Sequence, residues 1–142
     1  MRIFFTLVMA LFLYGETEFA EPRPDIDNVR KMVFGISSGE AEEINHVLSS
    51  INNVMKYYRP ENTQVKVIAY YHGIKALLKD NNEFKVRVEA LMTYDVEFIA
   101  CGNTMRTLNI KPDELLDGVE IVTAGIVEIN EAILKGYNYL LQ

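Results

Sequence analysis

The stretch VKVIAYY at residues 65–71 is the clearest β-strand in the sequence, because β-branched and aromatic side chains fill almost every position. His72 and Gly73 follow this stretch and end the strand. Upstream, KMVFGI at 31–36 is a short apolar run of the kind found in strands buried on both faces. Downstream, VEFIAC at 96–101 is a third apolar run. These three runs are expected to be strands of one sheet.

A helical pattern follows the strand at 31–36. Ser37 with Glu40 fits a capping box, in which two side chains satisfy free amides at a helix start. Pro60 ends the pattern, because proline disfavours helical geometry in the residue before it. One apolar stripe at spacings of three and four lies between these points: Ile44, Val47, Leu48, Ile51, Met55 and Tyr58. The stripe predicts an amphipathic helix.

The second half of the chain continues this alternation of strand and helix. A helix is expected over 82–94, a fourth strand over 119–123, and a last helix after it. Residues 137–141 are either an edge strand or a frayed end. The inward positions predicted for these two helices are Phe84, Val88 and Leu91 in the first, and Ile126, Ile129, Ile133 and Leu134 in the last.

Strands that alternate with helices imply right-handed crossover connections and a mainly parallel sheet covered by helices on both faces. We therefore expect an α/β fold with three layers, α/β/α, and a sheet of four to five strands. The length of 142 residues fits one domain with a single core. The sequence shows no internal repeat and no low-complexity tract.

The net charge of −6 limits the kinds of partner that the chain can bind. A protein that neutralises phosphates needs a basic face, so nucleic acid is not expected as a partner. The same negative charge disfavours adsorption to anionic lipid. The chain contains one cysteine, so it cannot form an internal disulfide.

The first twenty residues differ in character from the rest. Arg2 precedes an apolar run at 3–14, and the polar stretch 15–18 follows it. This order predicts a signal peptide over 1–20, cleaved after Ala20, with a linker at 21–28 and the domain at 29–142. The mature protein is then expected to be periplasmic or otherwise exported, without stable membrane association. The alternatives are a first β-strand or an uncleaved anchor.

In an open parallel sheet, ligands bind beyond the carboxyl ends of the strands, where helix amino termini also lie. This rule selects candidate site residues without any motif, because the strand ends place them on one rim of the sheet. The candidates are Ser37, His72, Gly73, Cys101, Gly102, Asn103, Thr104, Thr123 and Gly125.

Cys101 is the candidate with distinctive chemistry, because it ends a strand just before a helix begins. Unpaired amides at a helix start stabilise a thiolate, which is the nucleophilic form of cysteine. The alternative is that Cys101 is a small buried apolar residue. If its strand neighbours that of Cys101, His72 would tune the thiolate or pass protons; the alternative is that it simply caps the end of its strand.

Other chemical motifs are weak. With two histidines and one cysteine, the chain lacks the spacing of a metal site, and neither metal nor cofactor is expected. GISSG at 35–39 matches the letters of a nucleophile elbow, but no acid–histidine arrangement accompanies it, and the chain is too short for that fold. An enzyme with its own turnover therefore has no constellation to support it.

Three ordered blocks of the sequence resemble the DsrE/DsrF-like family of sulfur-relay proteins. The first is DVEFIACGNTMR at 95–106 with LNI at 108–110, the second is VIAYYHGI at 67–74, and the third is GVEIVTAGIVEI at 118–129. Together they span most of 31–141.

The resemblance implies a flavodoxin-like α/β/α fold and assembly into trimers or hexamers. In the sulfur-transferring members, a cysteine at the position of Cys101 carries sulfur as a persulfide, which implies sulfur donor and acceptor proteins as partners. The function expected for this chain is that of an exported protein that binds or relays sulfane sulfur on Cys101. The alternative is a non-catalytic oligomeric module of the same fold that binds a small ligand or a partner.

Overall fold

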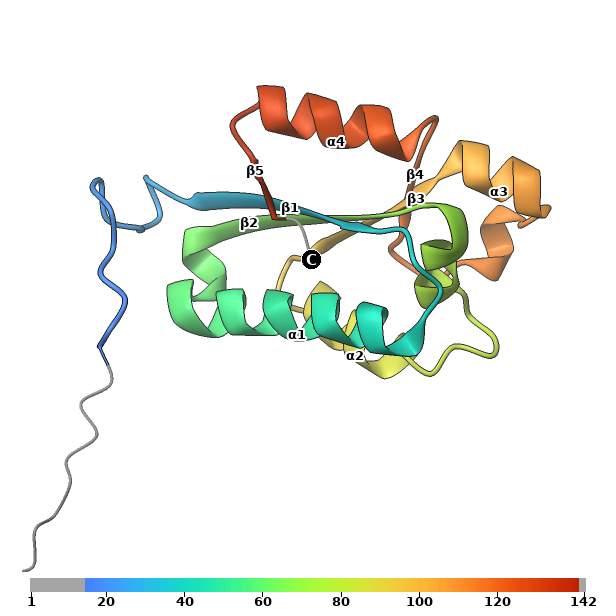
Figure 1. The fold of residues 1–142 in the computed structure, drawn as a ribbon, viewed down its shortest axis with the longest axis horizontal. Coiled ribbons are helices and arrows are strands. Elements are labelled where there is room, and N and C mark those ends of the chain that lie inside the picture. Colours follow the sequence, from blue (N-terminus) through green and yellow to red (C-terminus); the bar gives the residue numbers. More distant parts are fainter. Residues whose placement is uncertain (1–14, 141–142) are drawn as a thin grey trace, which may run out of the picture.

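The computed structural model describes residues 15–140, and the predicted apolar core of the signal peptide at 3–14 lies outside them. The described chain forms one five-stranded sheet with helices on both sides (Figure 1). The strands are β1 (Arg30–Ile36), β2 (Thr63–Ala69), β3 (Glu97–Cys101), β4 (Glu120–Val122) and β5 (Asn138–Leu140).

The strand order is β4-β3-β2-β1-β5, and every neighbouring pair is parallel. The predicted α/β class, the parallel sheet and the first four strands are therefore confirmed. The last strand is an edge strand: β5 pairs with β1, on the far side of the sheet from β4. Of the two alternatives for the end of the chain, the edge strand is correct.

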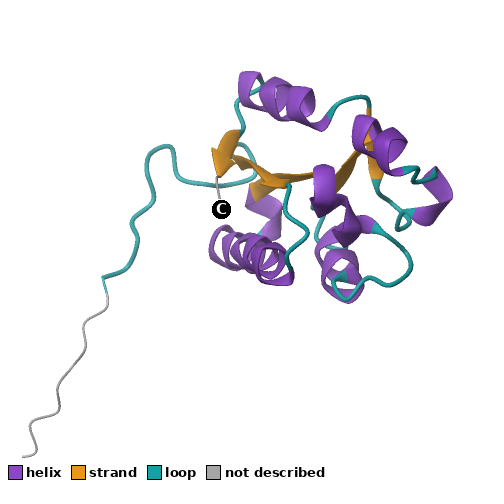
Figure 2. Cartoon of the chain, turned by 45° about the vertical axis from the view of Figure 1, so that its right-hand side comes forward, coloured by secondary structure: helices purple, strands orange, loops and turns teal. Residues whose placement is uncertain are grey.

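The helices divide into two layers. Figures 1 and 2 show α1 and α2 on one side of the sheet and α4 on the other. Across the described residues, no helix combines the length and the hydropathy needed to cross a membrane. The helical elements are α1 (Ala41–Tyr58), η1 (Pro60–Asn62), η2 (Tyr71–Leu77), α2 (Lys85–Met92), α3 (Gly102–Leu108), η3 (Pro112–Glu114) and α4 (Gly125–Leu134).

Most of the core lies on the side of the sheet that carries Phe34, Val67 and Phe98, which we call the α1 face. Successive strand residues point to opposite faces, so the alternate residues of β1, β2 and β3 gather here. The buried residues that cover this face from helices and turns include Ile44, Leu48, Ile51, Ile74, Leu77, Phe84, Val88, Leu91, Met105 and Leu115. The predicted stripes of the first two helices are thus confirmed.

The opposite side of the sheet carries Val33, Ile68 and Ile99, and we call it the α4 face. Its buried cluster is completed by only two residues of α4, Ile129 and Ala132. Because β5 lies beyond β1, α4 must cross the sheet from β4 to reach it, and it contacts β3, β2 and β1 on the way. One crossing helix leaves the α4 face more thinly covered than the α1 face.

The stripe predicted for the last helix is only partly correct. Ile129 is buried, but Ile126 is 63% and Leu134 is 73% exposed. Gly125 and Ala132 face the sheet beside Ile129 instead. Small residues at these positions allow the helix to lie close to the strands, so packing rather than hydrophobicity sets its inward face.

The predicted capping box at the start of α1 is wrong. The helix begins at Ala41, and its N-cap residue, Glu40, makes no side-chain cap. The Ser38 hydroxyl accepts a hydrogen bond of 3.0 Å from the Glu40 N–H. Ser37 stays with the strand end, because its carbonyl accepts a bond of 3.1 Å from Gly73 N–H.

The segment before β1 contacts the domain. The Phe19 ring lies 5.2 Å from that of Tyr57 and 5.7 Å from that of Tyr58, at the end of α1. The Arg30 guanidinium donates hydrogen bonds to the carbonyls of Ala20 at 2.7 Å and Pro22 at 2.9 Å. The predicted cleavage site after Ala20 therefore lies in a segment that contacts α1 and Arg30.

Candidate functional site

Cys101 lies at the end of β3 and points to the α4 face. It is two residues beyond Ile99, so the alternation of the strand gives both side chains the same side. It is also the N-cap residue of α3, with extended backbone geometry. The residue is 5% exposed, and its neighbour Asn103 is exposed at the rim. The thiol therefore sits beneath the surface, at the carboxyl end of the sheet.

A hydrogen bond to the thiol comes from another loop. The N–H of Gly125, the first residue of α4, donates a hydrogen bond of 3.2 Å to Cys101 Sγ. Glycine is needed there, because a Cβ would lie 2.9 Å from Ile68 Cγ2 and 3.1 Å from Cys101 Cβ. Gly125 thus lets the amino terminus of α4 approach the sulfur atom.

The surroundings favour the thiolate. Burial by itself raises the pKa of Cys101, but hydrogen bonds outweigh it and hold the pKa below the ordinary value of 9.0. The groups responsible are the Gly125 N–H, the Thr104 hydroxyl, and the N–H groups of Thr104 and Asn103. Since they belong to the starts of both α3 and α4, two loops act on one sulfur atom.

Thr104 also ties β2 to this site. Its hydroxyl oxygen accepts a hydrogen bond of 2.9 Å from the Tyr71 N–H, which leaves the hydroxyl proton free to point at Cys101. Next to it, Asn103 N–H donates to the carbonyl of Thr123 at 3.0 Å. These bonds fix the ends of β2, β3 and β4 around the thiol.

Gly102 allows the β3 and β4 ends to lie this close. A Cβ at Gly102 would come within 2.8 Å of the Val122 carbonyl oxygen. Six of the residues predicted for the site therefore lie together around the sulfur atom. They belong to the carboxyl ends of β3 and β4 and to the loops that follow: Cys101, Gly102, Asn103, Thr104, Thr123 and Gly125.

Ser37, His72 and Gly73 form a separate part of the rim. Gly73 N–H donates to the Ser37 carbonyl, and a Cβ at Gly73 would lie 2.0 Å from the Ile36 carbonyl oxygen. The exposed His72 packs beside Gly39, and the centre of its ring lies 4.0 Å from that of Tyr71, with the two ring planes tilted by 50°. Within residues 15–140, the contacts of these three residues join β1 to η2 and do not reach Cys101.

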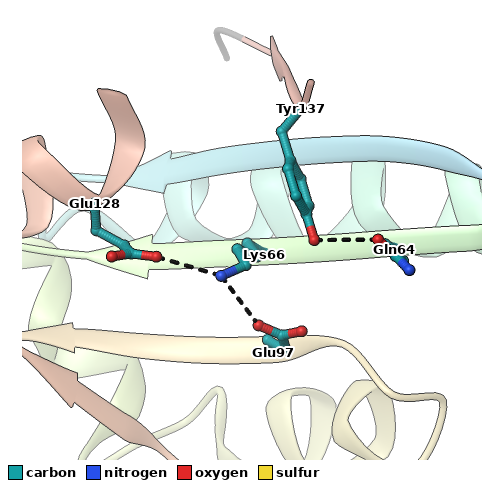
Figure 3. A network of polar contacts seen from close by, with 5 residues as sticks. All are labelled: Gln64, Lys66, Glu97, Glu128 and Tyr137. Atoms are coloured by element: carbon teal, nitrogen blue, oxygen red, sulfur yellow. Dashed lines mark hydrogen bonds and ion pairs between the residues drawn. The ribbon is translucent and has the colours of Figure 1, made fainter. Parts of the chain in front are cut away.

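A second polar cluster lies on the α4 face, at the amino ends of the strands (Figure 3). Lys66 Nζ lies 3.3 Å from Glu128 Oε1 of α4 and 3.4 Å from Glu97 Oε2 of β3. Burial alone would lower the pKa of Lys66, but the two carboxylates raise it above 10.5. Beside them the Tyr137 hydroxyl donates to Gln64 Oε1 at 3.3 Å. This cluster fastens α4 to the sheet.

The Lys66 cluster was not predicted from the sequence. A signal was present, because Lys66 is the one charged residue in the apolar run at 65–71. A lysine inside such a strand requires a carboxylate partner, and only the sheet order reveals which carboxylates lie nearby. Among the described residues, no group of three or more histidine, cysteine or acidic side chains is arranged to hold a metal ion.

Comparisons with solved structures agree with this architecture. The chain superposes on a protein of unknown function, MTH1491 from Methanobacterium thermoautotrophicum, with a TM-score of 0.74 and 30% identity, over 78% of this chain and 97% of that one. It is also similar in fold to the ychN protein from E. coli, with a TM-score of 0.69 and 19% identity, over 80% and 98% of the two chains. A comparison with curated proteins gave no match.

A comparison with protein families agrees with the resemblance drawn from the three sequence blocks. The sequence model of the DsrE/DsrF-like family matches residues 30–141, which include every strand of the sheet and the whole Cys101 site. The chain therefore belongs to the DsrE/DsrF-like family.

Proposed function

We propose that this protein carries sulfane sulfur as a persulfide on Cys101. The observation that supports the proposal most is the hydrogen bond from Gly125 N–H to Cys101 Sγ, inside a set of donors from two loops. Donors that lower the pKa of the Cys101 thiol keep the thiolate available to attack a donor's sulfur atom. They also make that thiolate a better leaving group when the outer sulfur atom passes to an acceptor.

The reaction requires no redox partner. The Cys101 thiolate attacks the outer sulfur atom of a donor persulfide, R–S–SH. A new S–S bond forms with the electron pair of the thiolate, and the old S–S bond breaks. The donor leaves as R–S⁻, and Cys101 holds –S–SH. An acceptor thiolate then attacks that outer sulfur atom, which returns Cys101 to its thiolate and creates a new persulfide on the acceptor.

A single cysteine suits this role. A resolving thiol in the same chain would attack the persulfide and release sulfide, but the chain has no other cysteine. The exposed Asn103 and Thr123 lie beside the buried sulfur atom, so the rim of the sheet is the side from which a donor or an acceptor would approach it.

We also propose that the protein is exported and works as a homo-oligomer, a trimer or a hexamer. Apolar residues left exposed on the outside of α4, Ile126, Ile133 and Leu134, support burial against another copy. The charged start and apolar run before residue 15 support export. Native mass spectrometry of protein isolated from its own compartment measures the oligomer size and the mature start together.

The experiment that tests sulfur transfer weighs the intact protein after incubation with polysulfide and removal of the excess reagent. We expect a gain of one sulfur atom, and no gain in the Cys101→Ser variant. Thr104→Val keeps the side-chain shape but lacks the hydroxyl group, so it should take up sulfur more slowly. An unchanged mass, or an equal gain in Cys101→Ser, would contradict the proposal and favour a non-catalytic binding module.

A further inference from the structure

The strand next to Cys101 has a free edge. β4 pairs with β3 on one side, and on its other side the described chain supplies no strand (Figure 1). Val122 of β4 is the direct neighbour of Cys101 in the sheet register. A segment added to this edge would therefore lie one strand beyond β4 and end at the rim that holds the thiol.

The carboxyl half of this edge is an apolar groove. A space of about 460 Å³ lies along the strand, bounded by Ile121, Val122, Thr123, Ala124, Val127 and Glu128. Ile121 is 45% exposed and Val127 is 54% exposed. Val122 of β4, which lies on the α4 face, and Val127 of α4 give the groove an apolar lining that suits one apolar side chain of an added segment.

The amino half of the same edge is acidic. A second groove of about 420 Å³ is lined by four carboxylates, Asp95, Glu97, Asp117 and Glu120. Lys66 pairs with Glu97, and Lys79 pairs with Asp117 at 3.0 Å. In the described part of the chain, Asp95 and Glu120 have no ion-pair partner.

The negative charge of this edge favours a basic segment over a second copy of the chain. A second copy paired antiparallel about a two-fold axis would set the acidic half of each edge beside the apolar half of the other, which offers no cation to Asp95 or Glu120. A basic segment would neutralise them. The backbone N–H and C=O groups of the free edge would bind any extended chain, whereas the two grooves add preference for particular side chains.

We propose that the β4 edge receives, by strand addition, an extended segment of the protein that exchanges sulfur with Cys101. This inference rests on the proposed function. The segment carries lysine or arginine opposite Glu120 and Asp95, and an apolar residue beside Val122 and Val127. Its reactive sulfur lies beyond the carboxyl end of β4, beside the part of the rim beneath which Cys101 is buried.

A binding experiment with defined peptides tests this surface. The probe is a fluorescein-labelled decapeptide of alternating lysine and valine. A control peptide has glutamate in place of each lysine. A third peptide carries N-methyl groups on alternate residues, which block strand addition. Fluorescence anisotropy at low salt should show the lysine peptide binding about ten-fold tighter than the glutamate peptide, and the preference should shrink as salt rises.

Variants locate the binding site on the protein. Glu120→Lys should weaken binding of the lysine peptide about five-fold, because it reverses an exposed charge beside the groove. Glu83→Lys makes the same change in net charge at an exposed position before α2, and it should have little effect. Equal losses in both variants, or equal binding of the N-methylated peptide, would overturn the proposal.

The outcome is separable from that of the sulfur-carrier function. Cys101→Ser should bind the lysine peptide as the unchanged protein does, because the thiol is not part of the groove. A protein that gains sulfur on Cys101 but binds lysine and glutamate peptides equally would refute the docking edge and leave the carrier function standing. Charge-selective binding without any sulfur gain would refute the carrier function alone.

Discussion

The two faces of the sheet differ in how they are covered. The α1 face is closed by α1, α2 and the turns between strands, and its buried cluster contains most of the core. The α4 face has one crossing helix and a cluster of five buried residues. The same thin face carries Cys101, the Gly125 amide that contacts it, and the Lys66 ion pairs. We infer that the first face supplies most of the stability and the second supplies the chemistry.

The order of the strands produces this difference. A chain that runs β1, β2, β3 and β4 in sequence places its crossovers on one side of the sheet. The last crossover returns to β5 at the other edge, so it alone covers the opposite side. Its helix starts at the rim of β4, and this start delivers the Gly125 N–H to the sulfur atom. The strand order therefore places the loop between β4 and α4 beside Cys101, in addition to the loop that follows β3.

The largest expected effect compares the two cores directly. Leu48→Ala on the α1 face should lower the free energy of unfolding by about 3–5 kcal/mol, because the removed side chain is fully buried and leaves a cavity. Ile129→Ala on the α4 face should cost about 2 kcal/mol, because the smaller cluster can relax. Urea unfolding followed by circular dichroism, at one protein concentration, measures both. An equal or greater loss for Ile129→Ala would contradict the unequal division of stability.

The next effect concerns the contact that joins α4 to the thiol. In Gly125→Ala, the new methyl group would crowd Ile68 and Cys101, and overpacking of this kind costs about 1–3 kcal/mol. The helix start must move away, so the pKa of Cys101 should rise as the Gly125 hydrogen bond lengthens.

Gly35→Ala is the matched control for this prediction. Gly35 lies on the same face, but a Cβ there would meet Tyr139 Oη at 3.3 Å and not the thiol. The pKa of Cys101 in this variant should match that of the unchanged protein. A shift of equal size in both variants would show that the Gly125 contact is not what lowers the pKa.

The smallest effect concerns the ion pairs under α4. Lys66→Met leaves Glu97 and Glu128 without their shared cation, and we expect a loss of about 1–2 kcal/mol near neutral pH. Because folding raises the pKa of Lys66, this contribution is present below the unfolded pKa and disappears as the pH rises through the folded value, above 10.5. The difference in urea midpoint between the two proteins should therefore vanish in strong alkali.

Lys79→Met is the control, because it removes an ion pair that is exposed to solvent. The Asp117 partner of Lys79 is 97% exposed, so solvent screens this pair and the urea midpoint should hardly change. A loss as large as that of Lys66→Met would contradict the assignment of Lys66 as the residue that fastens α4.

Much of the fold could be predicted from local patterns. The strands ending at Ile36 and Cys101 are apolar runs with clear stops, and the stripe over Ile44 to Met55 has helical spacing. Local patterns failed where tertiary packing decides. Ile126 lies in a helical stripe yet stays exposed, because the close approach of Gly125 sets which side of α4 meets the sheet.

The candidate site shows the same limit. That Cys101 ends a strand before a helix is visible in the sequence, and so are the amides of Asn103 and Thr104 beside it. That Gly125 also donates to the sulfur depends on β4 being the neighbour of β3. His72 was selected by the same rule of strand ends, but its contacts lie on the β1 side of β2. The sequence predicts which residues lie at the carboxyl ends of the strands, but the distances between these residues depend on the order of the strands in the sheet.

One titration tests the central claim that donors from two loops hold Cys101 as a thiolate. The ultraviolet absorbance of the thiolate is followed against pH in the folded protein and in the same protein unfolded by urea, with Cys101→Ser subtracted in each case. We expect Cys101 to ionise at lower pH in the folded protein than in the unfolded chain, and below 9.0. Ionisation in the folded protein at the same pH as in the unfolded chain, or at a higher one, would show that burial outweighs the hydrogen bonds and that the two loops do not hold a thiolate.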